Sequence, residues 1–327
     1  MIAIAISPAR FVRLTLIGIA FLGAVGHNAG AQDYPNRNIR LVIPFAAGGG
    51  TDTTARNLAA GLAKELGQQV VPDNRPGAAG NIAADLVVQS PADGYTLLFG
   101  ASVIATNVAF GPVPSFDPVK ALQPISLIAK SPFLVAVTPK LGIKSVKELV
   151  DAAKASPGKL SIGAAQLDVY VEQFNVQSGI QLVHVPYKGG SGVMADVLGG
   201  HINIVYAQAP ILLPQLRAGT LLALGVSADK RLDILPDVPT FLETGASKHL
   251  VTYWYGVFAP AGTPQAIVDR LAKATQKVMA DPKIAQSLRD VGIEPVSSTP
   301  QELGALLQNE LAFWLRARES SKDAPKK

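Results

Sequence analysis

The residues with the clearest chemical capacity are the backbone amides of a glycine-rich loop. The segment from Pro44 to Asp52 ends a β-rich run in Gly48-Gly49-Gly50, and a helical pattern follows it. Glycines let a backbone approach a guest closely, and the first N–H groups of a helix lack intrahelical partners and favour anions. The loop matches neither the P-loop pattern nor GxGxxG, so a nucleotide phosphate fits poorly. A ligand carboxylate fits this loop better than a nucleotide phosphate does.

Two simpler interpretations of this loop stay open at the level of spacing. The glycines are also typical of a tight turn between a strand and a helix. Asp52 is also typical of a helix N-cap, since a short acidic side chain accepts hydrogen bonds from first-turn amides.

Two further glycine-rich loops enter predicted helices. The loop Asn74–Asn81 carries Arg75, which could meet an anion or tie two neighbouring loops together. The loop Val185–Gly192 carries Ser191 in a nucleophile-elbow-like sequence that lacks the final glycine, and no acid and histidine follow in the order an α/β-hydrolase needs. His184 lies inside a strand pattern and is predicted to pack in the core. A serine nucleophile is therefore disfavoured.

Composition excludes several other kinds of chemistry. The 327 residues include no Cys and only 4 scattered His, without HExxH, so thiol chemistry and a histidine-rich metal centre are not expected. Lys+Arg 29 against Asp+Glu 24 gives a net charge of +5, and charged residues are only 16% of the chain. A nucleic-acid binder would carry a dense basic face. We expect no metal, no cofactor and no nucleic-acid partner.

These loops lie between elements that alternate like those of an α/β fold. Strand-like runs and helical patterns form a βαβαβ series from Ile39, and a second series begins at Phe133–Val137. Such alternation predicts mainly parallel sheets flanked by helices. Ser145 and Thr299 begin capping boxes, and Thr263 before Pro264 is predicted to be an N-cap. Crossings near 129–133 and 250–258 give lobe one as 32–132 plus 251–327 and lobe two as 133–250.

The first residues are predicted to be an export signal. Arg10 and Arg13 precede the apolar run Leu14–Val25, and Ala29-Gly30-Ala31 provides a cleavage site after Ala31. The alternative is a single N-terminal membrane anchor, for which this run is short. Cleavage would leave a periplasmic chain from residue 32 with a charge of 27 − 24 = +3.

Several blocks together resemble one family, the extracytoplasmic receptors of tripartite tricarboxylate transporters, or Bug family. The match runs through the whole chain after the leader and is carried by IRLVIPFAAGGGTDTTAR (39–56), DNRPGAAGNIAA (73–84), PADGYTLLFG (91–100), HVPYKGG (184–190), LPDVPTFLETG (235–245) and APAGTP (259–264). The resemblance implies a two-lobed "Venus flytrap" of the periplasmic-binding-protein type. It also implies a monomer that binds a small organic acid and presents it to a two-component membrane permease.

The resemblance also implies where the acid lies. Carried over by position, the lobe-one contacts are Phe45, Ala46, Gly48, Gly49 and Asp52, with Ser102 near the edge. In lobe two we expect ligand contacts from Ala164, Ala165, Gln166, Tyr187, Gly189 and Gln208.

The second lobe departs from the family's pattern. The loop Gly163–Tyr170 is shorter than the family's usual Gly- and Ser-rich stretch, and Asp168 places an acid where an anionic ligand is expected. Asn203 stands where aspartate is common. Gln166, Tyr170, Tyr206 and Gln208 could instead contact an aromatic or amide-bearing ligand.

The leading hypothesis is thus a binding protein without catalytic chemistry, which closes about its two crossings on a ligand. One alternative is a receptor that reports to a signalling partner. Another is a periplasmic hydrolase or isomerase that uses Ser191, His184 or Asp52.

Overall fold

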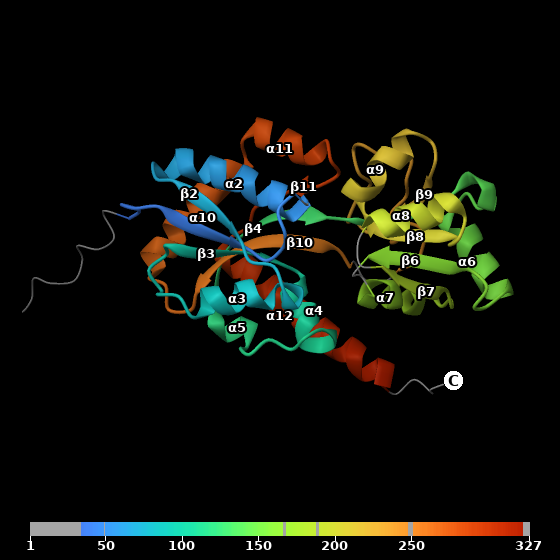
Figure 1. The fold of residues 1–327 in the computed structure, drawn as a ribbon, viewed down its shortest axis with the longest axis horizontal. Coiled ribbons are helices and arrows are strands. Elements are labelled where there is room, and N and C mark those ends of the chain that lie inside the picture. Colours follow the sequence, from blue (N-terminus) through green and yellow to red (C-terminus); the bar gives the residue numbers. More distant parts are fainter. Residues whose placement is uncertain (1–33, 49, 166–167, 188–189, 248–250, 323–327) are drawn as a thin grey trace, which may run out of the picture.

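Two β-sheets, each flanked by helices, form the two lobes of the molecule (Figure 1). The computed structural model describes residues 34–48, 50–165, 168–187, 190–247 and 251–322. The predicted leader, 1–31, lies outside them. Among the described helices, none combines the length and the apolar character needed to cross a membrane. The α/β, two-lobed fold predicted from sequence is confirmed.

Lobe one is built on a six-stranded sheet of order β11-β4-β10-β3-β1-β2. Its strands are β1 (Ile39–Ile43), β2 (Val70–Asn74), β3 (Thr96–Ala101), β4 (Leu122–Ser131), β10 (Tyr253–Pro260) and β11 (Glu294–Pro295). Its helices are α2 (Gly50–Leu66), η1 (Ala78–Gly80), α3 (Asn81–Val88), α4 (Val103–Phe110), α5 (Pro118–Ala121), α10 (Gln265–Met279), α11 (Pro282–Arg289) and α12 (Pro300–Lys322).

Lobe two is built on a five-stranded sheet of order β7-β6-β8-β5-β9. Its strands are β5 (Phe133–Val137), β6 (Ser161–Ala165), β7 (Val183–Tyr187), β8 (Ile204–Gln208) and β9 (Leu222–Val226). Its helices are η2 (Pro139–Leu141), α6 (Val146–Ala155), α7 (Asp168–Ser178), α8 (Gly190–Gly199) and α9 (Ala209–Arg217).

Both sheets are mixed, because the strands that connect the lobes run against their neighbours. β1 pairs in parallel with β2 and β3, and β6 pairs in parallel with β7 and β8. β10 is antiparallel to β3 and β4, and β5 is antiparallel to β8 and β9. The parallel strands therefore end at loops near the junction between the lobes, where such folds bind ligands.

The first strand and helix follow their sequence patterns. Leu41, Val42 and Ile43 are fully buried, as expected of a strand covered on both faces. The buried face of α2 is formed by apolar residues at helical spacing, Ala55, Leu58, Ala59, Leu62 and Leu66. This packing fixes the direction in which the start of α2 points.

Two of the three predicted helix starts are confirmed. Ser145 accepts a hydrogen bond from the N–H of Glu148, and Thr299 accepts one from the N–H of Glu302. The predicted N-cap at Thr263 is wrong: α10 begins at Gln265, and the Thr263 hydroxyl donates to the carbonyl of Pro260 at 2.8 Å. The hydroxyl fastens the preceding turn instead.

The long crossing strand β4 is not evident from its sequence. It contains Pro124, which is unfavourable in a central strand. The structure accommodates Pro124 where the register between β4 and β10 shifts, opposite Phe258. The chain crosses from β4 to β5 around residue 132 and returns into β10, near both predicted crossings. The exact lobe boundaries stay a prediction.

Candidate functional site

Asp52 organises the glycine-rich loop from within it. Its carboxylate accepts hydrogen bonds from the N–H of Gly48 at 3.0 Å, from Arg56 Nε at 2.9 Å and from Asn74 Nδ2 at 2.9 Å. The Arg56 hydrogen bond is the main reason why the pKa of Asp52 falls to about 2, and Gly48 and Asn74 add to the effect. The N-cap interpretation is wrong, because α2 begins at Gly50 and Asp52 lies in its first turn.

Residues at the end of β2 hold the end of β1 in place beneath the glycine-rich loop. Asn74 Nδ2 also donates to the carbonyl of Phe45 at 2.9 Å, and its Oδ1 accepts from Arg56 Nη2 at 3.0 Å. Arg75 Nε lies 3.0 Å from Asp73 Oδ2, and the Arg75 N–H donates to the carbonyl of Ile43. The Arg75 side chain is therefore held by Asp73 of its own segment, and its backbone N–H makes the link to β1, so the predicted tie between two loops is not made by its side chain.

The loop presents backbone, as its sequence predicts. Ala46 and Gly48 are exposed, and Gly48 has a φ of 89°, which favours glycine. The first-turn amides of α2 point away from the helix body and have no intrahelical acceptors. Since Asp52 is already neutralised by Arg56, this end of α2 is suited to an anion.

A tyrosine from lobe two enters lobe one beside this loop. Tyr170, in α7, is buried, and its hydroxyl lies 2.9 Å from Ser102 Oγ, which is fully buried between β3 and α4. Its ring packs edge-on against Trp314 of α12, with centroids 5.2 Å apart, and 4.7 Å from Phe133. The predicted contact Ser102 is thus bonded across the lobes.

A second phenol bridges the lobes at the other end of the loop. Tyr255, in β10, is buried, and Thr51 Oγ1 of lobe one lies 3.4 Å from its hydroxyl. The side chain of Gln208, at the end of β8 in lobe two, also lies near this phenol and offsets part of the effect of burial on its pKa. Burial raises the pKa of Tyr255, so the phenol stays neutral. Gln208 was predicted as a ligand contact, and the structure places it beside the α2 loop.

The lobe-two wall carries an acid and a histidine. Asp168 opens α7, is largely exposed, and its Oδ1 lies 3.4 Å from Nε2 of His184 in β7. His184 is partly buried, in the edge strand of the lobe-two sheet, rather than in the core proper. Asn203 serves the fold, since its Oδ1 accepts from the N–H of Ser161 at 2.9 Å and from its hydroxyl at 3.0 Å.

The other predicted lobe-two contacts are only partly described. Ala164 is buried within β6, and Tyr187 donates its hydroxyl hydrogen to Asp196 Oδ2 at 2.5 Å, within lobe two. Burial, assisted by Asp196, raises the pKa of Tyr187 to about 12. Gly49, Gln166 and Gly189 lie outside the described residues, as does the side chain of Ala165. The predicted contact set stays a prediction.

A cavity of about 350 Å³ opens between the lobes beside these groups. Phe45, Val103 and Phe110 line it from lobe one, and Asp168 and Tyr170 line it from lobe two. Its walls are mostly apolar. The described residues contain no cluster of three or more His, Cys, Asp or Glu that could hold a metal ion.

Two junction residues were missed by sequence reasoning. In the sequence, Trp314 lies in an amphipathic helical pattern and Tyr255 lies in a β-rich run. Core patterns and junction patterns use the same aromatic residues, so the sequence carries no signal that separates them.

Comparison with known proteins identifies relatives over most of the chain. The model of the tripartite tricarboxylate transporter family receptor matches residues 54–319. Protein BugT of Bordetella pertussis is 33% identical over 310 residues, covering 92% of this chain and 94% of BugT.

Solved structures show the same architecture. Rpa4515 of R. palustris, determined with adipate, superimposes with a TM-score of 0.78 at 34% identity, covering 89% of this chain and 99% of that one. MatC of Rhodopseudomonas palustris, with bound malate, gives a TM-score of 0.73 at 29% identity, covering 87% and 100%.

Proposed function

The chain belongs to the tripartite tricarboxylate transporter family of receptors, and from this premise we propose that it binds a small organic acid between its lobes. In this proposal the receptor works in the periplasm as a monomer and delivers the acid to a two-component membrane permease. Family membership also makes the chain a receptor and not an enzyme, so the hydrolase and isomerase alternatives are dropped.

One observation carries the proposal: the start of α2 is built to receive an anion next to a cavity lined by both lobes. Asp52, Arg56 and Asn74 hold the loop in shape, and the carboxylate of Asp52 is neutralised within that network. A ligand carboxylate placed at the first-turn amides would meet fixed donors and the positive end of the helix. The relatives bound to adipate and malate support this class of ligand.

The cavity beside the loop favours an acid with an apolar body. Phe45, Val103 and Phe110 offer apolar surface, whereas Asp168 opposes a second carboxylate at the α7 side. A hydroxyl or amine on the ligand could donate to Asp168. We therefore favour monocarboxylates with an aromatic or aliphatic body, with dicarboxylates bound less tightly.

A thermal-shift and calorimetry screen of the purified protein tests this proposal. The panel contains aliphatic and aromatic monocarboxylates, adipate, malate, citrate and acidic amino acids. A ligand at about 100 times its Kd should add about 2.7 kcal/mol of stability. If no acid of the panel raises the unfolding temperature or gives a binding heat, the proposal is wrong. Chemical conversion of a bound acid during long incubation would contradict the receptor assignment.

A further inference from the structure

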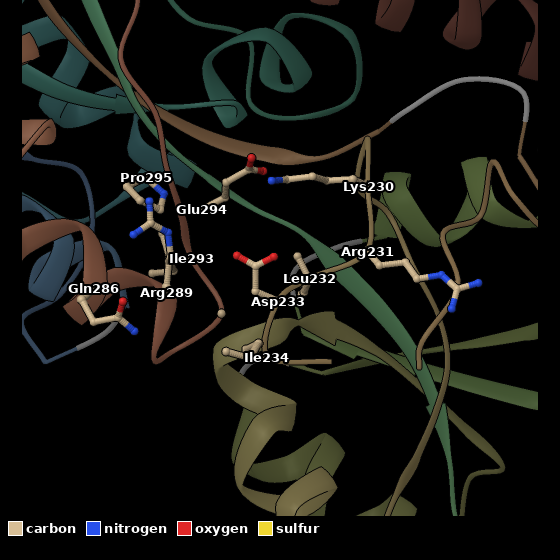
Figure 2. Close-up of a pocket in the computed structure, with 11 residues that line it drawn as sticks. Lys230, Arg231, Leu232, Asp233, Ile234, Gln286, Arg289, Ile293, Glu294 and Pro295 are labelled. Carbon is tan, nitrogen blue, oxygen red and sulfur yellow. The ribbon is translucent and has the colours of Figure 1, made fainter. Parts of the chain in front are cut away.

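A second cavity between the lobes, the rear cavity, has a volume of about 420 Å³ and lies at β11 (Figure 2). Lobe two lines it with the loop that follows β9, from Lys230 to Ile234. Lobe one lines it with the end of α11 and with β11, from Arg289 to Pro295. None of the predicted ligand contacts lies in its walls.

Sheet order places this cavity behind the strands that connect the lobes. In lobe one, β1 and β3 lie on one side of the β4–β10 pair and β11 lies on the other. In lobe two, β6, β7 and β8 lie on one side of β5 and β9 lies on the other. Figure 1 shows α9 and α11 on one side of β4 and β10, and α4 and α7 on the opposite side. A rotation that opens the α4–α7 side must therefore narrow this cavity.

The rim of the cavity is a genuine contact between lobes. A Cβ added at Gly292 would lie 2.8 Å from Cβ of Ala209 at the start of α9. Arg217 of α9 donates to the carbonyl of Asp290 at 3.0 Å. A movement of one lobe relative to the other therefore changes the shape of the cavity.

Arg231 in the wall of the cavity pairs with Glu243 of its own lobe at 3.1 Å, whereas four other charged groups there are unpaired in this conformer. Figure 2 shows the ammonium group of Lys230 directed toward the carboxylate of Glu294, and the carboxylate of Asp233 directed into the space between the lobes. Arg289 stands on the Glu294 side. In the part of the chain that the structure describes, none of these four groups forms an ion pair. Each lobe therefore presents one unpaired cation and one unpaired anion, and narrowing the cavity brings opposite charges together.

We infer that an ion pair between Lys230 and Glu294 forms when the α4–α7 side opens, and that this pair lowers ligand affinity by stabilising the open conformer. The pair lies behind β4 and β10, the strands that act as the hinge between the lobes. A ligand must break this contact to close the lobes, so the pair reduces the fraction of protein in the binding-competent conformer. The inference rests on the proposed function, because it concerns closure around the same ligand. Lys230 and Glu294 are then positioning residues that never touch the ligand.

Spin labels on the ligand-free protein test the inference directly. The chain has no Cys, so Val113→Cys and Val176→Cys give two unique label sites on the α4–α7 side, both well exposed. Lys230→Gln or Glu294→Gln should shift the distance distribution toward its shorter component. The double variant should go no further than either single one, because both changes remove one interaction. Ile234→Trp fills the cavity, so it should also shift the distance distribution toward its shorter component.

Affinity provides the second readout, with adipate and malate as the probes. Each neutralised variant should bind the probe about two- to five-fold more tightly, the range expected for an exposed ion pair. Lys277→Gln is the matched control, since Lys277 pairs with Glu65 at 2.7 Å inside lobe one. If every variant shows the same label distances and the same probe affinities as this control, the inference is overturned.

The two proposals fail in different ways. If neither probe binds the unaltered protein, the proposed ligand class is in doubt, while the label distances still report on the Lys230–Glu294 pair. If the probes bind and the variants leave both readouts unchanged, only the role of the rear cavity is lost.

Discussion

Asp52 illustrates how a residue can serve a binding site without facing the ligand. Its carboxylate accepts hydrogen bonds from Gly48, Arg56 and Asn74, so it contributes to binding by fixing the shape of the loop. The residue type and position were evident from the sequence. The partners were not, because Asn74 reaches Asp52 only through the pairing of β1 with β2.

Replacing Asp52 with Asn should destabilise the protein by roughly 2 kcal/mol at pH 7, through the loss of charge-assisted hydrogen bonds. The folded pKa, about 2, lies below the ordinary value of 3.8. The stabilisation is therefore complete above pH 4 or so and fades as the pH falls toward 2. Urea unfolding of both proteins at pH 7 and pH 3 measures the difference, which should shrink at the lower pH.

The exposed Asp151→Asn is a suitable comparison for Asp52→Asn. Asp151 pairs with Lys147 at the surface of α6, where an ion pair contributes little. Equal losses of stability in the two variants would refute the loop-organising role of Asp52.

A second residue-scale prediction concerns ligand choice. Asp168→Asn removes a negative charge from the wall of the interlobe cavity, so carboxylates should bind about two- to ten-fold more tightly. Dicarboxylates should gain more than monocarboxylates, and the gain should diminish as added salt screens the interaction. Isothermal titration calorimetry measures both. Unchanged affinities would place the bound acid away from Asp168.

At the scale of elements, strands and helices with local signals were predicted well. The strand–glycine–helix units and the capping boxes at Ser145 and Thr299 depend on neighbours within a few residues. β4 was missed because its pairing with β10 spans more than a hundred residues and absorbs Pro124 at a shift of register. The Thr263 error has a local origin instead, since the carbonyl of Pro260, three residues earlier, competes for its hydroxyl.

Helix α12 should make stability depend on pH near neutrality. Burial raises the pKa of Glu310 to about 7 from 4.5, and the indoles of Trp254 and Trp314 offset this only in part. Neither indole N–H reaches Glu310 with good hydrogen-bond geometry. The folded protein therefore holds a proton that the unfolded chain releases between these pH values, so stability is full below pH 4.5 and falls as the pH rises through 7.

Glu310→Gln should remove this dependence. We expect the variant to be more stable than the unaltered protein at pH 8 by a few kcal/mol, and similar to it at pH 5. Chemical unfolding at the two pH values is the measurement. A parallel decline of both proteins between pH 5 and pH 8 would show that another group is responsible.

At the scale of the whole molecule, the two-lobed α/β class followed from the alternation of elements, whereas the contact between the lobes did not. The sequence places Tyr170 in a helix of lobe two, and nothing local indicates that its ring ends between Ser102 and Trp314 of lobe one. The charges around the rear cavity were likewise invisible, since β11 and the loop after β9 meet only in the folded chain. Surfaces between lobes are set by long-range geometry.

The shared junction should make the lobes unfold together. One hydrophobic core runs from lobe one through Phe133, Tyr170 and Tyr206 into lobe two. We expect a single cooperative transition in differential scanning calorimetry of the unaltered protein. Tyr170→Ala removes the ring that packs against Phe133 and Trp314, at a cost of about 3–5 kcal/mol, and should separate the transitions of the lobes.

Tyr170→Phe distinguishes packing from hydrogen bonding at this junction. It keeps the ring and leaves Ser102 Oγ without its partner, so it should cost only about 1–3 kcal/mol and preserve a single transition. If Tyr170→Ala also melts in one transition, the crossing strands alone couple the lobes. In that case lobe closure is governed by the hinge and the rear cavity, and the aromatic contact serves only the stability of the conformer in which it forms.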